Sequence, residues 1–198
     1  MPRLFVAIDL SDAVRQAARS VQHAARPILP RDVRFPPIEN LHLTLHFLGE
    51  VEAAAVALVI SILHQEARSL VPFSLTTTTV GMFPSTGRGK ILWLGLKDEP
   101  GVLGDFVARL RASLGDFTQR PEDRPFRPHV TIGRSKLGRI RAQNLSDLAV
   151  QPANQRVEKI VLYESILGSG APQYQKLAEV SLAAATPGLP EDVQGPGV

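Results

Sequence analysis

The stretch Leu41-His42-Leu43-Thr44-Leu45-His46-Phe47-Leu48 alternates apolar and polar residues almost throughout. Alternation of this kind predicts a β-strand with one buried face. A shorter stretch further along the chain, His129-Val130-Thr131-Ile132, has the same pattern. Both predicted strands therefore carry the sequence His-x-Thr, in a chain that has only five histidines.

Each His-x-Thr pair is predicted to point to one side of its strand. Residues i and i+2 of a strand project from the same face. His42 therefore lies beside Thr44, and His129 lies beside Thr131. The apolar residues between and after them are expected to face the core on the opposite side: Leu43, Leu45, Val130 and Ile132.

The rest of the chain offers helices and strands on either side of these two stretches. Leu4–Leu10 is predicted to be a buried strand, and Ser11 is predicted to cap a helix that runs to about Ala25. A helix, a proline-rich loop and a His-x-Thr strand occur in each half, which predicts an α+β protein of two similar lobes. Further helices are expected at 50–69, 100–117 and 143–148, and further strands at 72–80, 90–96, 156–167 and 173–182.

The composition limits the class of protein. The chain has 198 residues, of which 44% are hydrophobic and 21% charged, and its net charge is +3. These proportions exclude collagen-like, disordered and membrane-spanning proteins. The absence of cysteine excludes a disulfide framework, a thiolate zinc site and a thiol nucleophile. We expect a cytoplasmic monomer with one bilobal domain over residues 1–185 and a disordered tail over 186–198.

Two histidines and two threonines suit the in-line opening of a phosphodiester. Such a reaction needs a base on the attacking oxygen and an acid on the departing one. Histidine can fill both roles, because both of its protonation states exist near neutral pH. Threonine hydroxyls can donate hydrogen bonds to the phosphate oxygens as charge develops there. A strained cyclic ester would need no metal ion or other cofactor.

The same residues could instead have a structural role or bind zinc. Each histidine could be a structural residue bonded to the backbone, and threonine is common in strands. His42 and His46 are four residues apart and could share a zinc ion on a helix. In the strand that the alternation predicts, however, their rings would be about 13 Å apart.

Positive charge gathers around the second motif. Eight basic residues between 111 and 141 face only three acidic ones. This segment is either an ordinary solvated surface or a rim that attracts a polyanionic strand. The basic residues are Arg111, Arg120, Arg124, Arg127, Arg134, Lys136, Arg139 and Arg141.

Taken together, the motifs resemble the two-histidine phosphoesterase superfamily, and within it the bacterial RNA 2′,3′-cyclic phosphodiesterases, also called 2′-5′ RNA ligases. The resemblance implies a bilobal α+β fold in which antiparallel sheets line a central cleft and helices pack outside. It also implies metal-independent hydrolysis of RNA 2′,3′-cyclic phosphate ends to 2′-phosphomonoesters. The matching stretches are 3–10, 42–50, 90–96, 126–134, 162–168 and 170–174.

The resemblance also implies roles for individual residues. His42 corresponds to the proton donor and His129 to the proton acceptor, while Thr44 and Thr131 correspond to phosphate-binding positions. Arg134 is expected to bind phosphate and Phe47 to pack against a base, although strict alternation places both residues on the core side of their strands.

Three questions stay open at this point. The same groups could run the reverse reaction, a 2′-5′ ligation, or could bind an RNA end without catalysis. Neither the composition nor the motifs distinguish among tRNA fragments, other oligonucleotides and small cyclic nucleotides as substrates. The chain carries no pattern that asks for a protein partner or a membrane.

Overall fold

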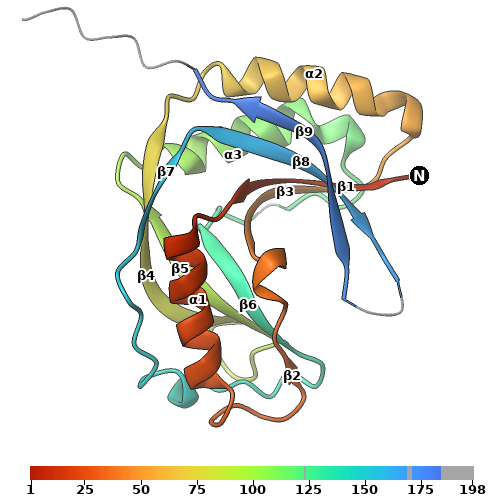
Figure 1. Cartoon of the computed structure of the whole chain (residues 1–198). Coiled ribbons are helices and arrows are strands. Elements are labelled where there is room, and N and C mark those ends of the chain that lie inside the picture. Colours follow the sequence, from red (N-terminus) through yellow and green to blue (C-terminus); the bar gives the residue numbers. More distant parts are fainter. Residues whose placement is uncertain (123, 169–170, 184–198) are drawn as a thin grey trace, which may run out of the picture.

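The computed structural model describes residues 1–122, 124–168 and 171–183 (Figure 1). The expected tail over 186–198 lies outside these residues. The described strands form one antiparallel sheet in the order β7-β4-β5-β6-β3-β1-β8-β9, and the short strand β2 pairs with β6. The strands are β1 (Arg3–Asp9), β2 (Val33–Arg34), β3 (His42–Glu50), β4 (Phe73–Phe83), β5 (Ile91–Asp98), β6 (His129–Ser135), β7 (Asn154–Val157), β8 (Lys159–Ile166) and β9 (Gln173–Ser181).

The sheet has two halves, each containing one of the His-x-Thr strands. One half consists of β3, β1, β8 and β9, and the other of β6, β5, β4 and β7. In the described part of the chain, β3 and β6 are paired at a single position, Leu43 opposite Val130. The two predicted antiparallel sheets are therefore joined at their inner edges into one curved sheet, as Figure 1 shows.

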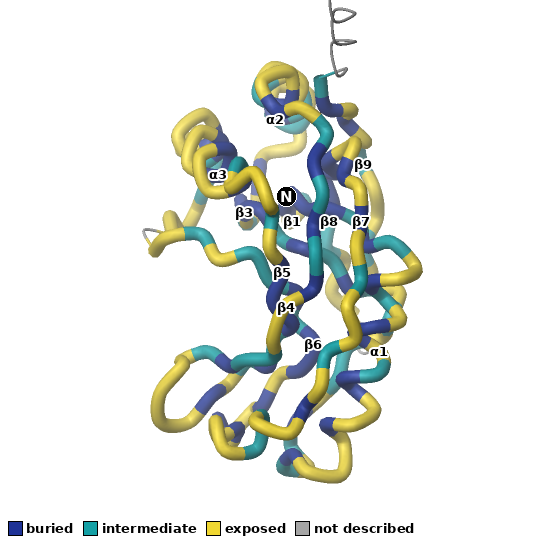
Figure 2. Tube along the Cα trace, turned by 90° about the vertical axis from the view of Figure 1, so that its left-hand side faces the viewer, coloured by how far each residue is buried: buried dark blue, intermediate teal, exposed yellow. Residues whose placement is uncertain are grey.

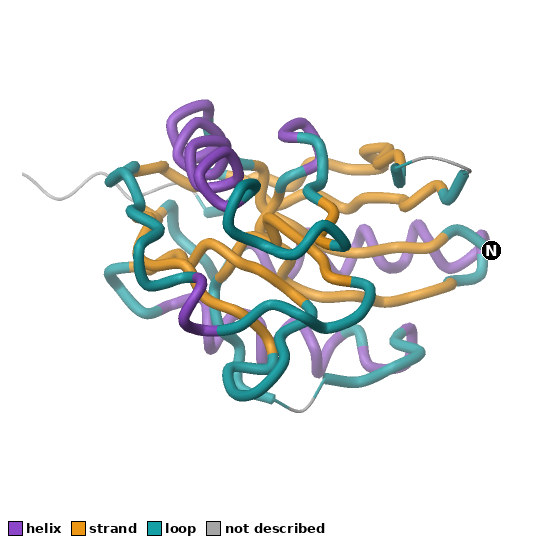
Figure 3. Tube along the Cα trace, turned by 90° about the horizontal axis from the view of Figure 1, so that it is seen from below, coloured by secondary structure: helices purple, strands orange, loops and turns teal. Residues whose placement is uncertain are grey.

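In the described residues, three helices lie against this sheet: α1 (Asp12–Ala25), α2 (Val56–Ala67) and α3 (Val102–Ser113). Helix α1 contacts β6 and β7, whereas α2 and α3 contact each other and the first half of the sheet. Figure 2 shows buried residues on the inner sides of α2 and α3 and exposed residues on their outer sides. Figure 3 shows helices on both sides of the strands. Because the sheet between them is antiparallel, this arrangement confirms the α+β prediction.

Helix α1 follows its sequence signals closely. The Ser11 side chain accepts a hydrogen bond from the Val14 backbone N–H at 3.4 Å, so it caps the helix as predicted. The negative charge of Asp12 in the first turn interacts favourably with the positive end of the helix dipole. The buried face carries Val14, Ala17, Ala18, Val21, Gln22 and Ala25.

Two predicted elements are wrong. The helix expected at 143–148 is a single 3₁₀ turn at Ala142–Asn144. The strand expected at 156–167 is two strands, because the chain changes partner at Glu158. Before this residue β7 pairs with β4, and after it β8 pairs with β1 and β9. A hydrophobic pattern records burial and not the identity of the neighbouring strand, so it continues through the change.

The other helices are shorter than predicted. The segment expected at 50–69 starts with a 3₁₀ turn at Ala53–Ala55 before α2 begins. The segment expected at 100–117 ends α3 at Ser113 and continues as a 3₁₀ turn at Gly115–Phe117. None of the helices in the described residues is both long enough and apolar enough to cross a membrane.

Candidate active site

The two His-x-Thr motifs lie side by side at the junction of the two halves of the sheet. Their strands run antiparallel and pair where Leu43 faces Val130. This direction places His42 on the side of Thr131, and Thr44 on the side of His129. The four motif side chains are partly exposed, whereas Leu43, Leu45, Val130 and Ile132 are at most 2% exposed, as the alternation predicts.

Both histidine rings are held in the same way. The Nδ1 atom of His42 lies 2.8 Å from the Asn40 carbonyl oxygen, and Nδ1 of His129 lies 2.7 Å from the Arg127 carbonyl oxygen. A carbonyl oxygen only accepts, so Nδ1 carries the proton in each ring. The Nε2 atom is thereby left to accept a proton when the ring is neutral, or to donate one when it is charged.

Burial and charge set the protonation of these rings. Burial is the largest cause that lowers the pKa of both histidines below the ordinary value. The hydrogen bond to the carbonyl raises each pKa in part, and the positive charge of Arg134 lowers both. Among the carboxylates of the described residues, Asp9 acts on His42, where its charge offsets part of the lowering of the pKa, and none acts on the pKa of His129. The two rings are therefore built alike but differ in their electrostatic surroundings.

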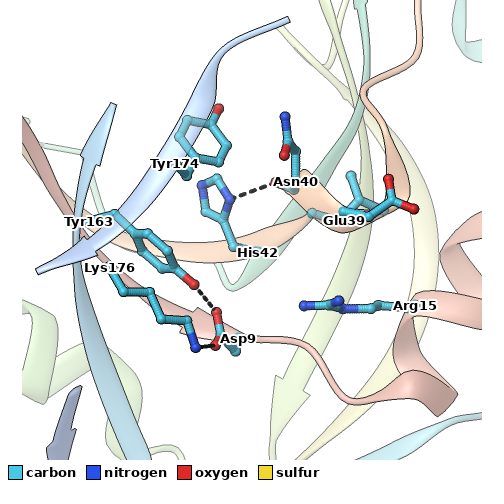
Figure 4. Close-up of a pocket in the computed structure, with 9 residues that line it drawn as sticks. Asp9, Arg15, Glu39, Asn40, His42, Tyr163, Tyr174 and Lys176 are labelled. Carbon is cyan, nitrogen blue, oxygen red and sulfur yellow. Dashed lines mark hydrogen bonds and ion pairs between the residues drawn. The ribbon is translucent and has the colours of Figure 1, made fainter. Parts of the chain in front are cut away.

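Asp9 lies directly across from His42 in the pairing of β1 with β3. Its carboxylate accepts a hydrogen bond from the Tyr163 hydroxyl and forms an ion pair with Lys176 at 2.8 Å (Figure 4). These residues line a cavity of about 220 Å³ beside His42. The cavity lining also includes Arg15, Glu39, Asn40, Leu41 and Tyr174.

A β-bulge brings Phe47 to the same face of β3 as His42. Thr44 pairs with Ala7, but the next residue of β1, Val6, pairs with His46, so Leu45 is an extra residue in β3. An extra residue reverses the alternation beyond it. Phe47 is consequently 58% exposed and packs against Phe5, whose ring also contacts His42.

An equivalent bulge in β6 turns Arg134 toward the second histidine. Trp93 pairs with Thr131 and Leu92 with Gly133, which leaves Ile132 as the extra residue. Arg134 is exposed, and its charge acts on both histidines. The expectation from strict alternation, that Phe47 and Arg134 lie on the core side, is wrong for both residues for the same physical reason.

A buried glutamine on α1 holds the second bulge in place. Gln22 is 4% exposed, and its Nε2 atom donates to the carbonyl of the bulge residue Ile132 and to the carbonyl of Pro36, both at 3.0 Å. Pro36 belongs to the segment that leads into β3. The two hydrogens of one amide group therefore tie together the two parts of the chain that carry the motifs.

His46 lies on the other side of the strand from His42. It is 5% exposed, and its Nε2 atom is 2.8 Å from the Thr118 hydroxyl. That hydroxyl donates to the Leu114 carbonyl, so it accepts from His46. Burial, and then the charge of Arg111, lower the pKa of His46 to about 4. His46 is thus a neutral residue of the interior that anchors the loop after α3, and it does not share a metal site with His42.

Aromatic residues around both histidines were missed from the sequence. Phe5, Tyr163 and Tyr174 surround His42 at ring-centroid distances of 4.8, 6.3 and 5.2 Å. Phe83 and Trp93 contact His129 at 5.0 and 6.3 Å. Phe5, Trp93, Tyr163 and Tyr174 all lie in stretches that match the family pattern, and this match is the sequence signal that could have indicated them.

The basic segment is only partly available to a ligand. Arg124 is bound to Glu122 at 2.6 Å, and Arg111 donates to the Arg124 carbonyl. Four further residues of this segment project into solvent beyond the second motif: Arg134, Lys136, Arg139 and Arg141.

The chain is similar to known proteins along most of its length. It is 32% identical to an RNA 2′,3′-cyclic phosphodiesterase of Thermus thermophilus over 98% of this chain and 96% of that protein. It is 30% identical to an RNA 2′,3′-cyclic phosphodiesterase of Methanothermobacter thermautotrophicus, over 87% of this chain and 94% of the relative.

Solved structures agree with this similarity. A crystal structure of a Thermus thermophilus protein matches with a TM-score of 0.77 and 29% identity, over 93% of this chain and all of that one. Escherichia coli LigT in complex with 3′-AMP matches with a TM-score of 0.69 and 27% identity, over 91% and 98%. The sequence pattern of the 2′-5′ RNA ligase superfamily matches residues 5–168, and the chain belongs to this superfamily.

Proposed function

We propose that this protein hydrolyses the 2′,3′-cyclic phosphate at the end of an RNA to a 2′-phosphomonoester, without a metal ion. The observation that carries the proposal is the pair of matched histidines, each with Nδ1 bonded to a carbonyl, Nε2 left for proton transfer and a threonine beside it. One ring can act as an acid while the other acts as a base.

The reaction follows from this pairing. The Nε2 atom of neutral His129 takes a proton from a water molecule, whose oxygen attacks phosphorus. The bond from phosphorus to the 3′ oxygen breaks, and Nε2 of protonated His42 gives that oxygen its proton. Thr44 and Thr131 donate hydrogen bonds to the non-bridging oxygens, and Arg134 offsets their negative charge.

The assignment of acid and base has a physical basis in Asp9. Burial lowers the pKa of both rings, but the Asp9 carboxylate lies opposite His42 and offsets part of the lowering there. None of the carboxylates in the described residues does the same for the pKa of His129. A negative charge favours the protonated ring. The asymmetry therefore supports His42 as the proton donor and His129 as the acceptor.

The relatives support the same substrate class. Several are named RNA 2′,3′-cyclic phosphodiesterase, and E. coli LigT has been solved with 3′-AMP and with phosphate. In the proposed complex the terminal base stacks on Phe47, whose ring is exposed on the same face as His42. Base stacking on an aromatic ring contributes about 1–3 kcal/mol.

The test is to identify the product. Protein stripped of metal is incubated in EDTA with an oligoribonucleotide that ends in a 2′,3′-cyclic phosphate, and the 2′- and 3′-phosphate products are separated. We expect the 2′-phosphate alone. A 3′-phosphate product would reverse the bond assignment, and activity that requires a divalent ion would contradict the mechanism. Tight binding with no product would favour a binding protein.

A 2′-5′ ligation, which gives the superfamily its name, would use the same groups on the same cyclic end and break the same bond to the 3′ oxygen. A 5′-hydroxyl would then replace the attacking water. The same catalytic groups would stabilise the transition state for either nucleophile. Because water is present at about 55 M, hydrolysis should dominate over ligation at a free RNA end. Efficient joining of two RNA halves with little hydrolysis would contradict this order.

A further inference from the structure

A second cavity lies beyond Phe47 at the far end of β3. Its volume is about 280 Å³, and it is separate from the cavity beside His42. Its walls come from β1, β3 and the loop that follows α3. The lining residues are Arg3, Phe47, Leu48, Gly49, Glu50, Gln119 and Arg120.

We propose that this cavity binds the nucleotide on the 5′ side of the cyclic end, so that the preferred substrate is an RNA of two or more nucleotides. This inference rests on the proposed function, because it places the cyclic phosphate at the two histidines. It adds a recognition site for the phosphate and nucleoside that a cyclic mononucleotide lacks.

The position of the cavity fits an RNA strand that leaves the site along β3. Thr44 and Phe47 are three residues apart on β3, or about 10 Å. A terminal nucleoside whose phosphate lies at Thr44 extends as far as Phe47. In the proposed complex the chain on its 5′ side continues along β3 toward Gly49 and Glu50, which line the cavity.

The charges of the cavity suit a phosphate. Arg3 and Arg120 are both exposed, and within the described part of the chain neither is in an ion pair within 4.0 Å. Glu50 lies opposite Arg3 in the pairing of β1 with β3 and also lines the cavity. Two guanidinium groups against one carboxylate leave a net positive charge, and a guanidinium binds phosphate oxygens in a two-point fork.

The wall that carries Arg120 is firmly built. The backbone N–H of Gln119 donates to the Leu48 carbonyl at 2.9 Å, and Thr118 is held by His46. Gly49 permits this close approach. Its φ is +86°, and a Cβ atom there would lie 2.6 Å from Oε1 of Gln119. The loop therefore approaches β3 closely enough to form a cavity with Phe47 at one end.

The experiment compares two substrates that share the same terminal nucleotide. One is a nucleoside 2′,3′-cyclic phosphate, and the other is a tetranucleotide with the same cyclic end. The variant carries both Arg3→Gln and Arg120→Gln. We expect KM for the tetranucleotide to rise about tenfold or more, as for loss of charged hydrogen bonds to phosphate, while kcat/KM for the cyclic mononucleotide stays unchanged.

Arg68→Gln is the matched control, since it removes an exposed arginine just after α2 that lines neither cavity. It should leave KM unchanged for both substrates. An equal effect of the double variant on the two substrates, or no effect on either, would overturn the subsite. If the unmodified protein hydrolyses neither substrate, the proposed function fails; if it hydrolyses both with equal efficiency, only the subsite fails.

Discussion

The burial of His46 makes a quantitative prediction about stability in acid. The pKa of this residue falls from 6.5 to about 4 because it is buried and lies near Arg111. A lowered pKa means that the folded protein favours the neutral ring. The contribution of neutral His46 to the free energy of unfolding is therefore complete above pH 6.5 and is lost as the pH falls from 6.5 toward 4.

The size of this effect follows from the two pKa values. At 1.36 kcal/mol for each pH unit, the whole difference corresponds to about 3 kcal/mol. Between pH 7.5 and pH 5 the linkage relation gives a loss of about 2 kcal/mol in the free energy of unfolding. Solvent screening reduces it little, because only 5% of His46 is exposed.

His46→Gln tests this prediction, because glutamine keeps an N–H that can donate to Thr118 but does not titrate. Urea denaturation at pH 7.5, 6 and 5 would give the free energy of unfolding of both proteins. The original protein should lose about 2 kcal/mol more than the variant over this range. His64→Gln, at an exposed position of α2, is the control and should behave like the original protein. Parallel curves for all three proteins would refute the reasoning.

Three further predictions concern the active site. Asp9→Asn removes the charge that favours protonated His42, so the alkaline limb of the kcat/KM profile should move to lower pH. If this limb does not move, Asp9 does not influence the proton donor. Arg134→Gln should raise the pKa of both histidines, so the whole bell-shaped kcat/KM profile should shift to higher pH, and KM should increase. A shift of the profile to lower pH would contradict the placement of Arg134 beside the two histidines. Gln22→Met leaves the buried Ile132 carbonyl and the partly buried Pro36 carbonyl without their donor, and it should lower the free energy of unfolding by about 2 kcal/mol or more in urea denaturation. Gln22→Met should also raise KM when it is made in the original protein, but not when it is made in Arg134→Gln. Thr77→Val is the control: it loses hydrogen bonds away from the site, so it should lower the free energy of unfolding and leave KM unchanged.

The alternation of β3 and β6 was enough to predict which residues face the core and which share a face near the motifs. His42, Thr44, His129 and Thr131 lie where that pattern places them. The predicted facing of the side chains is wrong beyond Leu45, because a bulge depends on the register of the partner strand and cannot be recognised from the alternation of apolar and polar residues. The same limit applies after Ile132.

Contacts between distant segments account for the other omissions. Asp9 faces His42 only because β1 pairs with β3 in one particular register. Gln22 lies in a helix whose apolar pattern gives no hint that a polar residue on its buried face binds two carbonyls. The chain also changes partner between β7 and β8, which a hydrophobic pattern does not record.

The most direct test of the account is the turnover of His42→Ala and His129→Ala on an oligoribonucleotide with a 2′,3′-cyclic end, in EDTA and at saturating substrate. General acid and general base catalysis each contribute about 10²–10⁴-fold to a rate. Each variant should lose turnover by a factor in that range while its urea midpoint stays close to that of the original protein. Turnover that survives unchanged in either variant would contradict the two-histidine mechanism.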